Sequence, residues 1–232
     1  NQEEIFVCKK AFFALLTNAT WLRMLICNYI ALIMSSPLLF LSRQQIIDCH
    51  HLVMEEAIRS MEEAFLLFAQ NNIQEASKHR LKISESSGIT AAATAIKLTN
   101  EDWYGCKVLT AKEANPDMGV RRSQGLLILF DRTTLAPICI MDAAVVNAVR
   151  TGAISALAAR YLCHSSIKKV ALIGAGTQMR TQLLGLVAIL KQIEEVKVFS
   201  RRASKFEFTH EMSEKTGLSI QPVHSLKECL VK

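Results

Sequence analysis

Residues 170–179 read VALIGAGTQM and place a short aliphatic run directly before a glycine-rich turn. An aliphatic run, a Gly-x-Gly turn and a segment with helical character to Leu190 together predict a strand, a phosphate-binding loop and a helix. The first glycine makes the tight turn, the second admits backbone N–H groups to a pyrophosphate, and the helix N-terminus adds partial positive charge. The third glycine position of the fingerprint holds Met179, so the strand–loop–helix context carries the prediction. A glycine-rich turn without a ligand is the alternative.

The same alternation of strands and helices continues towards the end of the chain. The sequence predicts a helix over 178–190, a strand over 196–199, a helix over 203–216 that ends at Gly217, and a strand over 219–223. Strands that alternate with helices of this length favour a parallel sheet with right-handed crossovers. We therefore expect an α/β fold in which residues 163–232 form the first half of a Rossmann dinucleotide-binding domain, the doubly wound parallel sheet.

The end of the second predicted strand bears on which dinucleotide is bound. An NAD-selective fold places an acid there to accept hydrogen bonds from the ribose hydroxyls, whereas this chain has Ser200, Arg201 and Arg202. Two guanidinium groups suit a 2′-phosphate, which arginine binds in bidentate fashion. We expect NADP(H) as the preferred cofactor and keep NAD(H) as the alternative. Two solvated arginines at a strand end would be the simpler explanation.

Residues 38–162 predict a mixed α+β domain. Ser42 and Gln45 have the spacing of a capping box. Apolar residues then recur with helical period at Met54, Ala57, Ile58, Met61, Ala64, Phe65 and Phe68. The expected strands are 80–83, 90–98, 125–130 and 137–141, with a turn at 131–134, and an alanine-rich helix covers 142–162.

Residues 1–37 predict a hydrophobic extension that takes no part in the chemistry. No charged residue occurs between Met24 and Ser42, but Asn28 and Pro37 interrupt the apolar run and argue against a membrane-spanning helix. A signal anchor and a non-native extension both fit this pattern. Asn1 in place of a start methionine indicates a fragment or a processed chain.

Composition excludes several classes of protein. The 232 residues are 50% hydrophobic, which rules out a disordered chain. The net charge of +6 comes from scattered Lys and Arg, and only 6% of residues are aromatic, so we expect no nucleic-acid partner. The seven cysteines form no C-x-x-C pair, which predicts no metal site and favours reduced thiols in the cytoplasm.

Several motifs together resemble one family. They are Tyr104-Gly105-Cys106-Lys107, Asn115-Pro116, Ser123-Gln124-Gly125-Leu126, Arg150-Thr151-Gly152-Ala153 and Gly174-Ala175-Gly176-Thr177-Gln178. From about residue 38 onwards the chain resembles the ornithine cyclodeaminase/mu-crystallin family. This resemblance implies a homodimeric oxidoreductase of amino-acid metabolism that exchanges hydride between a nicotinamide and the Cα of an amino acid through an imine. It also implies that residues 38–162 bind the substrate and form the dimer interface. Members include ornithine cyclodeaminases, amino-acid dehydrogenases and ketimine reductases.

The resemblance also implies roles for individual residues. Arg80 and Lys107 would bind the substrate carboxylate, and Lys107 would also act as the catalytic proton-transfer group. Arg150 would lie near the substrate carboxylate and the nicotinamide or its phosphates, with Thr151 beside it. The remaining cofactor contacts would be Gly174, Ala175, Gly176, Thr177, Gln178, Ser200, Arg201 and Arg202. Without the resemblance, Arg80 would pass for a surface charge and Lys107 for a side chain that extends from a half-buried strand.

Two departures from the family pattern keep other functions open. Ornithine cyclodeaminases carry an acid ahead of the Tyr-Gly-x-Lys motif, and residues 90–96 contain none, whereas residues 115–125 are closer to the siderophore-type dehydrogenases. The chain also stops shortly after Cys229, so we expect it to lack the family's catalytic Asp and the second half of its nucleotide domain. The alternatives are an ornithine cyclodeaminase that uses NAD catalytically, a mu-crystallin-like protein that binds NADPH without turnover, and an inactive fragment.

Overall fold

The computed structural model describes residues 38–48, 53–97, 102–164 and 166–230. The extension expected over residues 1–37 lies outside these ranges. The described chain forms two compact units. The first contains the residues up to Val53 together with Arg59–Asn147, and the second contains Met54–Ile58 together with the residues from Ala148 onwards.

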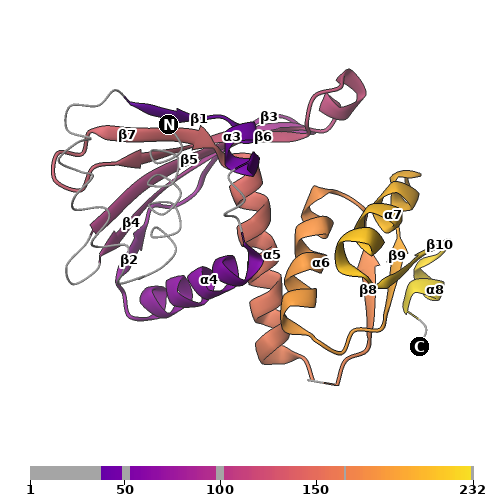
Figure 1. The fold of residues 1–232 in the computed structure, drawn as a ribbon. Helices are drawn as coiled ribbons and strands as arrows, with labels where there is room; N and C mark the ends of the chain where they lie inside the picture. Colours follow the sequence, from indigo (N-terminus) through magenta and orange to yellow (C-terminus); the bar gives the residue numbers. More distant parts are fainter. Residues whose placement is uncertain (1–37, 49–52, 98–101, 165, 231–232) are drawn as a thin grey trace. The chain divides into compact units, whose positions relative to one another are not determined.

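A mostly antiparallel sheet forms the body of the first unit (Figure 1). Its described strands are β1 (Leu39–Leu41), β2 (Ile73–Glu75), β3 (His79–Ser84), β4 (Ser87–Lys97), β5 (Asp102–Lys112), β6 (Ser123–Phe130) and β7 (Pro137–Asp142). They lie in the order β1-β7-β6-β5-β4-β2, and β3 also pairs with β4. β1 runs parallel to β7, whereas the other pairs are antiparallel. The strands expected at 80–83, 125–130 and 137–141 are confirmed.

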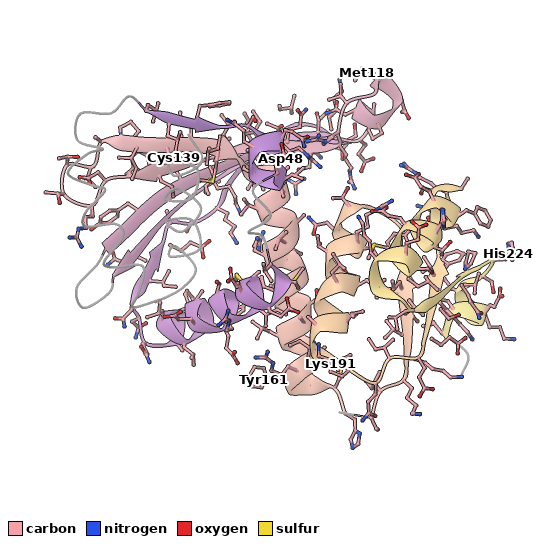
Figure 2. All side chains as sticks on the ribbon, viewed as in Figure 1. Asp48, Met118, Cys139, Tyr161, Lys191 and His224 are labelled. Carbon is pink, nitrogen blue, oxygen red and sulfur yellow. The ribbon has the colours of Figure 1, made fainter. Side chains whose placement is uncertain are left out.

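One face of this sheet carries the core of the first unit. Leu127 and Leu129 alternate with exposed or half-buried neighbours on β6, and they pair with Met141 and Cys139 on β7. Cys139 is fully buried among these strands (Figure 2). Burial of a large apolar side chain stabilises the folded state by about 1.5–3 kcal/mol. Because side chains alternate between the two faces of a strand, the positions of these apolar residues determine which face of the sheet is directed towards the core.

Helices cover the core of the first unit. They are α3 (Arg43–Asp48), the part of α4 (Met54–Ala69) from Arg59 onwards, and the first turn of α5 (Ala143–Leu162). A short 3-10 helix, η1, spans Asn115–Met118 in the connection between β5 and β6. Ile46, Leu67 and Val146 are buried in the same cluster. The capping box before α3 is confirmed, because Ser42 N–H donates to Gln45 Oε1 at 2.9 Å and Gln45 N–H donates to Ser42 Oγ at 3.3 Å.

A parallel sheet forms the centre of the second unit. Its described strands are β8 (Lys169–Ile173), β9 (Glu195–Phe199) and β10 (Ser219–Val223), in the order β10-β9-β8. α6 (Thr177–Ile189) follows β8, α7 (Ser204–Thr216) follows β9, and α8 (Leu226–Leu230) follows β10. The core includes Leu183, Val196, Val198, Phe208 and Met212, all completely buried. The predicted β-α-β-α-β order and parallel pairing are confirmed, and Gly217 ends α7 at a φ of 70°.

The structure decides the place of elements that the sequence pattern leaves open. β5 lies in the middle of the first sheet although Gly105 and Lys107 interrupt its apolar pattern, because its place depends on pairing with two other strands. Helix α5 changes unit between Asn147 and Ala148. This division describes compactness, so the functional boundary between a substrate-binding region (38–162) and a dinucleotide-binding region (163–232) stays a prediction.

Candidate functional site

The glycine loop lies at the carboxyl edge of the parallel sheet in the second unit. Ile173 at the end of β8 pairs with Phe199 at the end of β9, and Gly174 N–H donates to Phe199 C=O at 2.8 Å. Gly174 has a φ of 118°, a backbone conformation that few other residues adopt. Because ligands of open α/β sheets bind outside the carboxyl ends of the strands, this loop is in the position expected for a dinucleotide site.

The N-terminus of α6 has the features of an anion site. Gly176 is the N-cap residue without a side-chain cap, and the first turn of the helix carries no acid. Gly176, Thr177 and Gln178 are exposed, and the first N–H groups of a helix have no intrahelical acceptor. Within the described chain, no non-adjacent atom lies within 4 Å of the position that a Cβ on Gly176 would take. The loop therefore fits a pyrophosphate approached by backbone N–H groups.

Ser200, Arg201 and Arg202 lie beside this loop in the topology, because they directly follow β9. Arg202 N–H donates to Ser200 Oγ at 3.3 Å, and both arginines are exposed. No acid occupies the end of β9. The arrangement leaves two guanidinium groups at the sheet edge where the ribose of a dinucleotide would be held.

The Arg150-Thr151-Gly152 motif is in the second unit as well. A Cβ on Gly152 would lie 2.3 Å from Thr181 C=O, and a Cβ on Gly185 would lie 2.5 Å from Gly152 C=O. These two glycines let the backbones of α5 and α6 approach closely, and the helices run side by side (Figure 1). Arg150 and Thr151 are half-buried on the helix that packs against the one following the glycine loop.

Arg80 and Lys107 lie on the same face of the sheet in the first unit. Arg80 on β3 pairs with Thr90, and position 92, two residues further along β4, pairs with Lys107 on β5. Directly paired positions share a face, as do positions two apart on one strand. Lys107 in turn pairs with the buried Leu127, so this is the face that carries the core. Arg80 is exposed at its edge and Lys107 is half-buried within it.

Asn147 is a candidate that the sequence did not indicate. Lys107 Nζ donates to Asn147 Oδ1 at 3.3 Å across 40 residues of sequence, and both side chains are partly buried. The one available signal was a polar residue among the apolar residues of Ala143–Val149. The contact fixes the ammonium group at the sheet face on which Arg80 also lies.

The candidate residues thus fall into two groups, each within one unit. The second unit brings together the glycine loop, Ser200–Arg202 and the Arg150 motif, and the first unit holds Arg80, Lys107 and Asn147. In the described ranges, no group of His, Cys, Asp or Glu side chains is arranged to hold a metal ion. No helix of those ranges combines the length and hydropathy that a bilayer crossing requires.

The family comparison covers nearly all of the described chain. The model of the ornithine cyclodeaminase/mu-crystallin family matches residues 40–231. An alanine dehydrogenase of Archaeoglobus fulgidus is 31% identical over 178 residues, which are 76% of this chain and 53% of that protein. The chain therefore spans about half the length of this curated relative.

Solved structures show the same fold. A Thermococcus litoralis Δ(1)-pyrroline-2-carboxylate reductase, in complex with NADH and L-proline, superposes with a TM-score of 0.77 at 29% identity over 83% of this chain and 58% of the other. An archaeal alanine dehydrogenase dimer with bound NAD gives a TM-score of 0.72 at 30% identity, over 83% of this chain and 57% of the other.

Proposed function

The chain belongs to the ornithine cyclodeaminase/mu-crystallin family, and from this premise we propose that it is an NAD(P)-dependent oxidoreductase of amino acids or their imines. The observation that carries the proposal is the glycine loop at the N-terminus of α6, where Gly176, Thr177 and Gln178 are exposed residues and the first turn carries no acid. The relatives named as alanine dehydrogenase and pyrroline-2-carboxylate reductase support the reaction class.

The second unit would hold the cofactor, which supplies the hydride acceptor or donor when bound. The N–H groups of Gly176, Thr177 and Gln178 would bind the pyrophosphate, because a helix N-terminus favours anions. Gly174 and Ala175 would shape the turn. Arg150 and Thr151 would contact the cofactor from α5.

The first unit would hold the substrate. Arg80 and Lys107 would bind its carboxylate, since both are cations on one sheet face and fixed cations suit a carboxylate. Loss of hydride from Cα and of a proton from the amine turns an amino acid into its imine. In the reductive direction the Lys107 ammonium would give a proton to the imine nitrogen, and in the oxidative direction its neutral amine would take that proton up. Asn147 Oδ1 would hold Nζ in place by accepting its hydrogen bond.

We propose a preference for NADP(H) on the strength of Ser200, Arg201 and Arg202. The two solved relatives are named with NADH and with NAD, so the preference rests on this chain's own residues. Two exposed guanidinium groups and the absence of an acid at the end of β9 favour a 2′-phosphate.

We further propose a homodimer that assembles through the first unit. Large apolar side chains are exposed on α4 and β3 in that unit, namely Phe65, Phe68, Leu81 and Ile83, and such surface favours association. The named alanine dehydrogenase dimer supports this assembly.

The described cysteines, Cys106, Cys139, Cys163 and Cys229, are free thiols, which supports a cytoplasmic location.

The test is to supply the chain with NADPH or NADH and a panel of cyclic and acyclic imino acids, and in reverse with NADP⁺ or NAD⁺ and amino acids. The proposal expects net oxidation of the reduced nicotinamide with at least one imine. Ammonia release from ornithine without net change of nicotinamide would instead indicate a cyclodeaminase. Binding of NADPH without turnover on any substrate would indicate the mu-crystallin-like alternative.

A further inference from the structure

Arg180, on the first turn of α6, makes three contacts that hold its guanidinium plane. Its Nη1 donates to Ala175 C=O at 3.1 Å, and its Nε donates to Glu211 Oε2 on α7 at 2.6 Å. The guanidinium carbon lies 5.3 Å from the centre of the buried Phe208 ring. Only 23% of the side chain is exposed, so an ordinary surface salt bridge does not describe it.

The contact to Ala175 controls the direction of a loop N–H group. A trans peptide is planar, and its C=O and N–H point in opposite directions. Because Arg180 holds the carbonyl of the Ala175–Gly176 peptide, it also sets where Gly176 N–H points. That N–H belongs to the N-cap residue of α6, the first of the three exposed residues Gly176, Thr177 and Gln178.

Glu211 keeps Arg180 in this position. Its carboxylate accepts hydrogen bonds from Lys215 Nζ at 2.7 Å and from Arg180. These two partners, Lys215 first, lower the pKa of Glu211 below its ordinary value against the opposing effect of burial. The carboxylate therefore stays charged at neutral pH and holds the guanidinium by a charge-assisted bond.

We propose that Arg180 is a positioning residue that orients the Ala175–Gly176 peptide for pyrophosphate binding, with Glu211 holding Arg180. This inference rests on the proposed dinucleotide function. Arg180 itself does not need to touch the ligand. A purely structural tie between α6 and α7 would contribute to stability without changing the affinity of the folded protein for a dinucleotide.

The first measurement compares variants of the full chain by titration with NADH and NADPH. Arg180→Met should weaken both by about tenfold, because the pyrophosphate is common to them and a pre-oriented donor is lost. Glu211→Leu should weaken both by about threefold, since Arg180 keeps its contact to Ala175 but loses its anchor. In the double variant the losses should not add, because Glu211 acts through Arg180.

Two controls separate positioning from structure. Lys215→Met removes the other partner of Glu211 and should leave both affinities within about twofold. Met212→Ala removes a fully buried side chain of α7 and should lower stability by about 2–5 kcal/mol without changing the affinity of the folded protein. The inference would be overturned if Arg180→Met bound both dinucleotides as tightly as the parent, or lost no more affinity than Met212→Ala.

The second measurement does not need a ligand. In a ¹⁵N-glycine-labelled protein, Arg180→Met should shift the Gly176 amide resonance while Gly119 and Gly217, which lie away from α6 in the sequence, stay in place. An unmoved Gly176 resonance would overturn the inference. If the parent chain bound neither NADH nor NADPH, the proposed function would fail, whereas the shift of Gly176 would still decide whether Arg180 orients this peptide.

Discussion

Gly152→Ala tests the close approach of α5 and α6 that packs the Arg150 motif against the helix following the glycine loop. The added Cβ would lie 2.3 Å from Thr181 C=O, 2.6 Å from its carbonyl carbon and 3.0 Å from its Cβ. A carbon and a carbonyl oxygen approach no closer than about 3.3 Å in ordinary contacts. Since the obstacle is backbone on a packed helix, the two helices must separate by about 1 Å.

The expected cost follows from two opposing effects. Overpacking of a well-packed interface costs about 1–3 kcal/mol, whereas alanine is favoured over glycine inside a helix by about 1 kcal/mol. Gly185 tightens the same contact, because its own Cβ position lies 2.5 Å from Gly152 C=O and 3.2 Å from Ala156 Cβ. We therefore expect Gly152→Ala to lower the free energy of unfolding by about 1–2 kcal/mol.

Urea denaturation followed by circular dichroism measures the global effect, and hydrogen exchange of the α6 amides locates it. Gly176→Ala is the matched control, because its Cβ would meet no other part of the described chain and its φ of −93° suits any residue. That control should stay within about 1 kcal/mol of the parent yet lose at least about tenfold in dinucleotide affinity, since the methyl group occupies the pyrophosphate approach. If Gly152→Ala were as stable as the parent, with unchanged protection of α6, the two helices would not meet at this glycine.

Three further predictions concern charged residues and Asn147, which accepts a hydrogen bond from one of them. Arg201→Ala with Arg202→Ala should weaken NADPH by at least about tenfold and NADH by less than about twofold, and equal losses in a binding titration would contradict the 2′-phosphate assignment. Asn147→Leu should raise the KM for the imine by about tenfold without changing NADPH affinity, whereas Lys107→Met should abolish turnover. Steady-state kinetics on both variants would test these roles, and an unchanged KM in Asn147→Leu or turnover in Lys107→Met would contradict them. Because the pKa of Glu211 is lowered in the folded protein from 4.5, its stabilising contribution is complete above that value and is lost as the pH falls through the folded pKa. The difference in unfolding free energy between the parent and Glu211→Gln should therefore shrink below about pH 4.5, and a constant difference down to acid pH would show that the ion pair has no role.

Local patterns were enough to predict most of the second unit. The aliphatic runs of β8 and β9, the Gly-x-Gly turn and the stop at Gly217 each depend on neighbours within a few residues. The capping box of Ser42 and Gln45 is confirmed for the same reason. The first sheet was harder to predict, because β5 gains its place from pairing with β4 and β6 rather than from its own pattern.

The same contrast between local sequence signals and long-range contacts applies to the candidate site. The glycine loop and Ser200–Arg202 could be located from sequence, since consecutive parallel strands end at one edge of the sheet. The links to Asn147 and Arg180 could not, because a polar or charged residue in a helix has many partners available until the fold selects one. Arg180 meets Glu211 across 31 residues, and Lys107 meets Asn147 across 40.

The sequence by itself therefore determined the family, the order of strands and helices in the second unit, and the position of the phosphate-binding loop. Only the tertiary structure decided that Arg80 and Lys107 share a sheet face, that Gly152 and Gly185 bring two helices into backbone contact, and that Arg180 holds the loop peptide. The physical reason is the sequence distance over which each determinant acts. Turn, cap and periodicity signals act within about one helical turn or one strand, whereas register and helix packing depend on residues that meet only after the chain has folded.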